Sequence, residues 1–188
     1  LAARALEARE VGSPVDLEAN EVSSTRAGLV RRSLEPIPFE VPVSEEDGRE
    51  RAGSAAYDRI LVDAPCTGLG ALRRRPESRW RKSPQDVAPL AELQGELLSA
   101  AVTGLRPGGV VAYVTCSPHL AETRDVVAAV LDQHRNELEE LDARGVLRRV
   151  SRNVPDLATP GSGGGRAQLW PHRHGTDAMS ITLLRRRG

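Results

Sequence analysis

The sequence predicts an α/β protein built on a mostly parallel β-sheet. Two short apolar runs, residues 60–62 and 110–114, lie between turn-forming residues, as buried parallel strands do. Residues 84–105, between these runs, place apolar side chains on one helical stripe. Strands and helices that alternate in this way form βαβ units, and ligands of such sheets bind at the carboxyl ends of the strands.

Length and composition predict one soluble globular domain. The 188 residues are 39% hydrophobic and 28% charged, which is ordinary for such a protein. The 26 basic and 26 acidic residues cancel, so a nucleic-acid surface would have to be a local patch. No apolar run approaches the roughly 18 residues of a membrane span. Two cysteines exclude a disulfide-dense secreted scaffold and a four-thiolate zinc site, so we expect a cytoplasmic protein, with a monomer favoured.

Residue spacing predicts the remaining elements. In the first third of the chain these are a helix over residues 1–10, a short strand ending near Glu21, a helix over 23–34 that two prolines end, a strand over 39–43 and a polar loop over 44–56. In the rest they are a long loop over 64–84, a helix over 121–131 with a polar continuation to 149, a linker over 151–165 and a strand over 178–184.

Acidic or thiol side chains follow four of the predicted strands. Glu21 follows the first strand, Asp47 comes shortly after the second, Asp63 and Cys66 follow the third, and Cys116 follows the fourth. This recurrence indicates one shared site, and an acid after the second strand of a nucleotide-binding sheet can hold ribose hydroxyls. Each acid taken alone could equally be a helix N-cap or a loop carboxylate.

The two cysteines lie in polar turns that follow buried strands. The first turn reads Asp-Ala-Pro-Cys-Thr-Gly-Leu-Gly (63–70), in which a proline and two glycines fix the backbone around the thiol. The second reads Tyr-Val-Thr-Cys-Ser-Pro (113–118). A lone cysteine is more often a small buried hydrophobe, but both thiols here leave the same edge of the sheet. A disulfide between them fits this geometry but is disfavoured in a reducing cytoplasm.

These turns carry a family resemblance. The segments 63–68, 73–82, 105–109 (Leu-Arg-Pro-Gly-Gly), 115–117 and 169–177 closely resemble the RNA cytosine-5 methyltransferases of the Sun/Fmu (RsmB-like) type. The resemblance covers roughly residues 19–184. It implies a Rossmann-like fold with an antiparallel C-terminal strand, S-adenosylmethionine as cofactor, and RNA as partner, with 16S ribosomal RNA as the expected substrate.

The resemblance also implies roles for single residues. Cys116 would be the nucleophile that adds to the cytosine ring, and Cys66 would help to release the product. Asp63 would lie beside both the methyl donor and the ring, while Glu21 matches the ribose-binding acid and Asp47 the acid beside the adenine. DNA cytosine-5 methyltransferases use their Pro-Cys thiol as the nucleophile, so exchanged roles of the two thiols are the main alternative.

A basic segment with an aromatic residue is the candidate RNA contact. Its members are Arg73, Arg74, Arg75, Arg79, Trp80, Arg81 and Lys82. The cations can meet phosphates and Trp80 can stack on a base. The alternative is a solvated loop with Trp80 packed against the core. His172 and His174 have no third metal ligand nearby, so we expect surface or RNA-facing histidines and no metal site.

One departure from the family concerns the cofactor loop. Nothing before Glu21 resembles the Cys-Ala-Ala-Pro-Gly-Gly-Lys-like loop of these enzymes, and glycines 163–165 follow no buried strand. We therefore expect residues 1–188 to be a partial catalytic domain, truncated before its first strand and without an N-terminal RNA-binding domain. Such a chain would leave the missing strand's neighbours unpaired and exposed, would bind the methyl donor weakly or not at all, and would be inactive alone. A methyltransferase acting on DNA or protein, and a non-catalytic RNA-binding remnant, are the competing interpretations.

Overall fold

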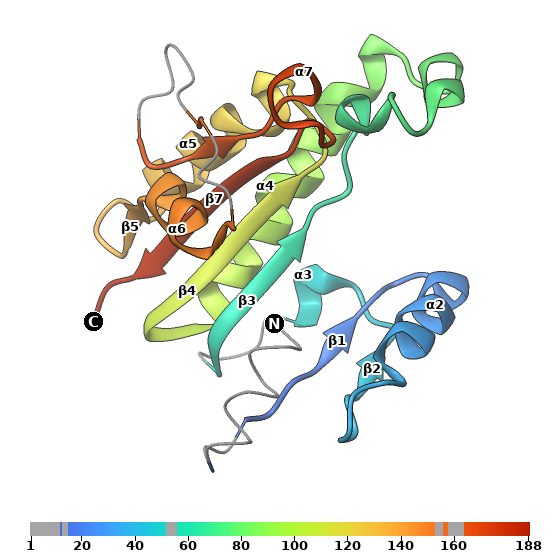
Figure 1. The fold of residues 1–188 in the computed structure, drawn as a ribbon. Helices are drawn as coiled ribbons and strands as arrows, with labels where there is room; N and C mark the ends of the chain where they lie inside the picture. Colours follow the sequence, from blue (N-terminus) through green and yellow to red (C-terminus); the bar gives the residue numbers. More distant parts are fainter. Residues whose placement is uncertain (1–11, 13–14, 52–55, 153–155, 158–163) are drawn as a thin grey trace. The chain divides into compact units, whose positions relative to one another are not determined.

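The computed structural model describes residues 12, 15–51, 56–152, 156–157 and 164–188 (Figure 1). These residues form two compact units, Leu1–Ala52 and Gly53–Gly188, and each is described by itself. The helix expected over residues 1–10 lies outside the described residues, as does most of the expected linker.

The first unit contains two short parallel strands and two helices. They are β1 (Ala19–Asn20), α2 (Ser24–Leu34), β2 (Val43–Ser44) and α3 (Gly48–Arg51). The strand before Glu21 and the helix that ends before the prolines are confirmed. The strand over 39–43 was predicted too long, because Pro42 has no N–H and only Val43 and Ser44 pair with β1. The short helix α3 lies within the predicted polar loop.

The second unit is built on one sheet in which a single strand opposes the others. Its strands are β3 (Tyr57–Asp63), β4 (Leu105–Thr115), β5 (Leu138–Leu141), β6 (Ala167–Gln168) and β7 (Ser180–Arg186). The order is β3-β4-β7-β5, with β6 also paired to β7. β3 is parallel to β4, and β7 is antiparallel to β4, β5 and β6. The mostly parallel sheet with an antiparallel C-terminal strand is therefore confirmed (Figure 1).

Helices and 3-10 turns join these strands. The helices are α4 (Val87–Gly104), α5 (Arg124–Gln133), α6 (Ala143–Val150) and α7 (Pro171–His174). The predicted loop over 64–84 contains two 3-10 turns, Leu69–Ala71 and Pro76–Trp80. A third, Pro84–Asp86, directly precedes α4, and a fourth, Leu120–Glu122, precedes α5. The predicted polar continuation to residue 149 is wrong, since β5 and α6 occupy that stretch. In the described part of the chain, no helix has the length and apolar character of a membrane span.

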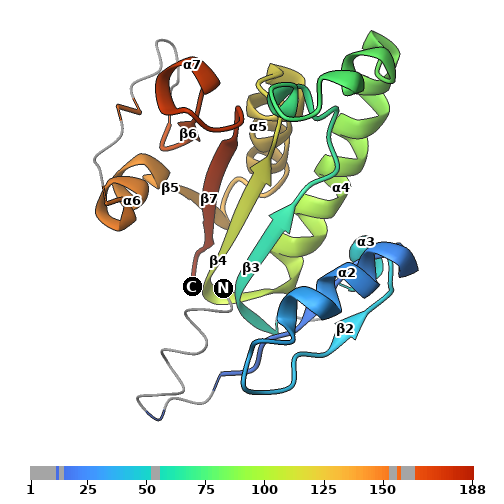
Figure 2. The same ribbon diagram turned by 45° about the vertical axis from the view of Figure 1, so that its right-hand side comes forward.

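The core lies between the sheet and the helices α4 and α5, which cover one of its faces (Figure 2). Leu98 and Val102 of α4 and Val130 of α5 pack there with Val111 and Tyr113 of β4, all at most 2% exposed. Burying a side chain of this size contributes about 1.5–3 kcal/mol. The apolar sequence of β3 predicts a fully buried strand, but Leu61 of β3 is half exposed.

Three segments of the second unit meet at Gly70. Its N–H donates to the carbonyl of Cys116 at 2.9 Å, and its carbonyl accepts from the N–H of Ala178 at 2.9 Å. A Cβ atom at this position would lie 2.1 Å from the Ala178 oxygen and 2.7 Å from the Cys116 oxygen. Only glycine therefore lets the first cysteine turn touch both the second turn and the segment before β7.

The substitution Gly70→Ala is expected to lower the free energy of unfolding by about 1–3 kcal/mol, the usual cost of overpacking. Urea unfolding followed by circular dichroism measures this loss. Gly95→Ala in α4 is the matched control, since a Cβ there meets nothing within 4 Å. That substitution should raise stability by about 0.5–1 kcal/mol, because alanine favours helix over glycine. Equal stability of the two variants would contradict the close packing at Gly70.

Candidate active site

The two cysteine turns begin at the same edge of the sheet because β3 and β4 are parallel neighbours. Asp63, the last residue of β3, is paired in register with Val114, next to the end of β4. The N–H of Ala64 then donates to the carbonyl of Val114 at 2.9 Å, which continues the pairing into the first turn. Cys66 and Cys116 follow directly, so the chain brings both thiols to one place.

The sulfur atoms of Cys66 and Cys116 are 3.4 Å apart, at hydrogen-bonding distance, and the two residues are free, partly buried cysteines. This is the juxtaposition expected from the sequence. The contact lowers the pKa of Cys116 to about 7, because the Cys66 thiol can donate to the Cys116 thiolate. The same contact, together with burial, raises the pKa of Cys66 above its usual range. Cys116 is therefore the thiol that ionises, and Cys66 the thiol that keeps its proton.

Two carboxylates oppose the ionisation of Cys116. The negative charges of Asp63 and Asp177, as well as partial burial, raise the pKa of its thiol, but the hydrogen bond from Cys66 outweighs them. Asp63 is exposed at the end of β3. Its carboxylate is thus available to a ligand beside the thiol pair.

Asp177 is held by an arginine of the predicted RNA-binding segment. Arg74 donates to both carboxylate oxygens of Asp177, at 2.5 to 3.0 Å, and Asp177 is only 8% exposed. These hydrogen bonds keep the pKa of Asp177 below its usual range. Arg74 therefore joins the basic segment, which follows the first cysteine turn, to the segment before β7, a role that was not predicted from the sequence.

The other members of the basic segment lie in exposed positions around the 3-10 turn Pro76–Trp80. Trp80 is 82% exposed, and the guanidinium of Arg79 lies 5.4 Å from the centre of its ring. The alternative that Trp80 packs against the core is therefore wrong. An exposed indole beside a cation can stack on an unpaired base.

His174 makes structural contacts instead of facing solvent. Its Nδ1 accepts from the N–H of Trp170 at 2.8 Å, and its Nε2 lies 2.8 Å from the carbonyl of Asp156. The ring of His172 is 6.1 Å from that of Trp170. Within the described ranges, no group of three or more His, Cys, Asp or Glu side chains is arranged to hold a metal ion.

In the first unit, the two predicted cofactor acids follow β1 and β2. Oε1 of Glu21 accepts from the N–H of Ser23, the residue before α2, at 2.9 Å and from Arg26 at 2.7 Å. Both oxygens of Asp47 accept from Arg49, which lowers the pKa of Asp47 to about 2. This pair is exposed to solvent.

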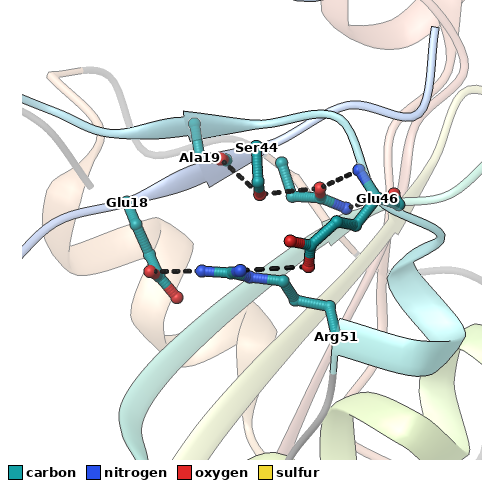
Figure 3. A network of polar contacts seen from close by, with 6 residues as sticks. Glu18, Ala19, Ser44, Glu46 and Arg51 are labelled. Carbon is teal, nitrogen blue, oxygen red and sulfur yellow. Dashed lines mark hydrogen bonds and ion pairs between the residues drawn. The ribbon is translucent and has the colours of Figure 1, made fainter.

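A polar network fixes the strands that carry these two acids (Figure 3). Arg51 of α3 pairs with Glu18 at 2.6 Å and with Glu46 at 3.1 Å. Asn20 of β1 accepts from the hydroxyl of Ser44 at 2.8 Å and donates to the carbonyl of Glu46 at 3.0 Å. The positions after β1 and β2 are therefore held by side chains as well as by the short backbone pairing.

Sequence reasoning also missed Glu122. This residue is fully buried beneath both cysteine turns. The acid precedes α5 in the sequence and resembles an ordinary residue of a helical first turn, so no local signal distinguishes it.

The chain is similar in sequence and in structure to known proteins. A protein of Mycobacterium tuberculosis (strain H37Rv), provisionally named as the methyltransferase Rv1407, is 54% identical over 168 residues, 89% of this chain and 34% of the relative. The solved structure of PH0851 matches with a TM-score of 0.78 at 28% identity, over 90% of this chain and 36% of the other. The structure of NSun6 from Pyrococcus horikoshii with SFG matches with a TM-score of 0.72, over all of this chain and 51% of the other. Because the two sequences are only 22% identical, this match shows the fold alone.

These likenesses confirm the Rossmann-like α/β fold that the sequence predicts. The chain spans about a third of the length of the curated relatives it matches. A family model described as 16S rRNA methyltransferase RsmB/F matches residues 10–185. The chain therefore belongs to the 16S rRNA methyltransferase RsmB/F family.

Proposed function

We propose that the protein transfers a methyl group from S-adenosylmethionine to carbon 5 of a cytosine in 16S ribosomal RNA, through a covalent adduct with Cys116. The observation that carries the proposal is the 3.4 Å contact between Cys66 and Cys116. It makes one thiol acidic and keeps the other protonated. A methyltransferase acting on nitrogen or oxygen would not require such a pair.

Carbon 5 of cytosine is a weak nucleophile, and the thiolate solves this problem. The Cys116 thiolate forms a bond to carbon 6, and the electron pair of the 5,6 double bond makes carbon 5 nucleophilic. S-adenosylmethionine, when bound, would supply the electrophilic methyl group to carbon 5, with its methyl–sulfur bond broken and S-adenosylhomocysteine as the leaving group. A base then removes the proton from carbon 5, the carbon–sulfur bond breaks, and the thiolate of Cys116 is restored. The target base must leave its stack to reach the thiol.

Cys66 and Asp63 support this sequence of steps. Cys66 keeps its proton beside the reacting sulfur, and we assign it to product release. The exposed carboxylate of Asp63, at the end of β3, lies close enough to Cys116 to affect the ionisation of its thiol. We assign Asp63 to the ring nitrogen of the cytosine, which gains a proton when carbon 6 is attacked, and to the methyl donor beside it.

The acids of the first unit are the proposed cofactor ligands. Both described hydrogen bonds of Glu21 use Oε1, which leaves Oε2 for a ribose hydroxyl. Asp47 can bind a group of the adenine only after its ion pair with Arg49 is broken, and an exposed ion pair is a weak interaction. The residues present therefore fit S-adenosylmethionine, with Glu21 the better prepared of the two.

RNA is the proposed partner of the exposed basic segment. Arg73, Arg75, Arg79, Arg81 and Lys82 offer cations to phosphates, and Trp80 offers a ring to a base. Arg74 differs from them because Asp177 already engages it. A non-catalytic RNA-binding remnant would use this same surface, so RNA binding alone does not distinguish the two functions.

The roles of the two thiols are tested by trapping the covalent adduct. The Cys66→Ala variant, incubated with 16S ribosomal RNA and S-adenosylmethionine, should accumulate a protein–RNA adduct that survives denaturing electrophoresis, because the adduct forms but is not released. Cys116→Ala should form none. An adduct with Cys116→Ala alone would assign the nucleophile to Cys66. Adducts with neither variant, while the unaltered protein methylates RNA, would refute covalent catalysis.

The pH dependence of thiol alkylation tests the assigned ionisation. Iodoacetamide reacts with thiolates, so the rate at Cys116, followed by mass spectrometry, should be half maximal near pH 7 and fall about tenfold per unit below it. Cys66→Ala removes the hydrogen-bond donor and should move the midpoint upward, toward about 8.5. An unchanged midpoint in Cys66→Ala would show that the contact with Cys66 does not cause the shift.

A further inference from the structure

Glu122 is a fully buried acid that the proposed chemistry does not use. It ends the 3-10 turn Leu120–Glu122 before α5, and its exposure is 0%. Acidic side chains are almost never buried to this extent unless they are paired or fully hydrogen-bonded. Its contacts therefore indicate why the position holds an acid.

The carboxylate of Glu122 accepts hydrogen bonds from both cysteine turns. Oε1 accepts from the backbone N–H of Thr67 at 2.7 Å and from the side-chain amide of Gln94 at 3.3 Å. Oε2 accepts from the hydroxyl of Thr67 at 2.5 Å and from that of Ser117 at 2.6 Å. Thr67 directly follows Cys66 and Ser117 directly follows Cys116, so one side chain joins the residues next to both thiols.

We propose that Glu122 is a positioning residue that holds the two cysteine turns together and so maintains the contact between the sulfur atoms of Cys66 and Cys116. Its carboxylate touches neither sulfur atom and acts through Thr67 and Ser117. The meaning of this role for catalysis rests on the proposed function, whereas the effect on the thiols themselves does not.

Further contacts make Glu122 the centre of a buried network. Gln94 of α4 also donates to the carbonyl of Pro65 at 2.8 Å, so the residue before Cys66 is held from the same side. The hydroxyl of Tyr113 lies 2.8 Å from the Glu122 carbonyl and 3.1 Å from the side-chain oxygen of Gln94. These side chains are at most 2% exposed, so water cannot replace a lost partner without a rearrangement of the turns.

The thiols provide a direct measure of this positioning. The charges that raise the pKa of the Cys116 thiol belong to Asp63, the last residue of β3, and Asp177, before β7. The substitution Glu122→Gln removes the negative charge of Glu122 and keeps its contacts. A shift in the ionisation of Cys116 that occurs in Glu122→Ala and not in Glu122→Gln would therefore report a changed distance to Cys66.

Three variants of the full chain separate positioning from general destabilisation. Glu122→Ala removes all four acceptor contacts. Glu122→Gln keeps them, because its amide oxygen can accept from the N–H of Thr67 and from Gln94 while its amide group donates to the two hydroxyl oxygens. Leu98→Ala is the control, since it creates a cavity in the core on α4 and removes none of the hydrogen bonds of Glu122.

Alkylation of Cys116 by iodoacetamide is measured against pH for each variant, without RNA or methyl donor. In Glu122→Ala we expect the midpoint to rise by about one pH unit or more, as the hydrogen bond from Cys66 is lost. Glu122→Gln and Leu98→Ala should keep the midpoint of the unaltered protein, although Leu98→Ala lowers the unfolding midpoint in urea.

Either of two results would overturn the proposal. One is an unchanged midpoint in folded Glu122→Ala, which would show that the turns keep their spacing without the acid. The other is an equal shift in Leu98→Ala, which would show that loss of stability alone separates the thiols. If Glu122→Ala does not fold, Thr67→Val replaces it: loss of the hydroxyl contact should raise the midpoint by a smaller amount, and no rise would count against the proposal. A failed RNA-trapping experiment would leave these outcomes unaffected.

Discussion

The contact between the sulfur atoms of Cys66 and Cys116 is the interaction on which the chemistry of this fold depends. A single buried thiol among carboxylates would hold its proton, since burial and negative charge both disfavour the thiolate. The second thiol reverses this balance by donating a hydrogen bond. The contact is available because β3 and β4 are parallel neighbours that end in register, so residues 50 positions apart in the sequence meet at one edge of the sheet.

Arg74 differs from the other cations of the basic segment because it forms an ion pair with a carboxylate near the two thiols. Asp177 lies close enough to raise the pKa of the Cys116 thiol, yet Arg74 binds it through both oxygens. The ion pair fixes the segment before β7 against the first cysteine turn, as does the backbone pairing at Gly70. Structural support and the electrostatics of the thiol are thus provided by the same few residues.

The sequence predicts those parts of the fold that have a local pattern. The strands around residues 60–62 and 110–114 and the long helix α4 follow from apolar spacing, and the position of both thiols follows from the turns after these strands. β5 was missed, because a strand of four residues with two glutamates is defined by its pairing with β7 and not by its own composition. The ion pair of Arg74 with Asp177, 103 residues away, is likewise invisible locally.

Glu122 shows the same limit at the site itself. Burial of a carboxylate is costly, and an apolar residue of similar volume is often as stable or more so at such a position. An apolar residue, however, cannot accept hydrogen bonds from a backbone N–H, an amide and two hydroxyls at once. The turns that carry Cys66 and Cys116 would then lose a partner that binds both of them. The acid is therefore best explained by the geometry it imposes on the thiols, which only the folded chain reveals.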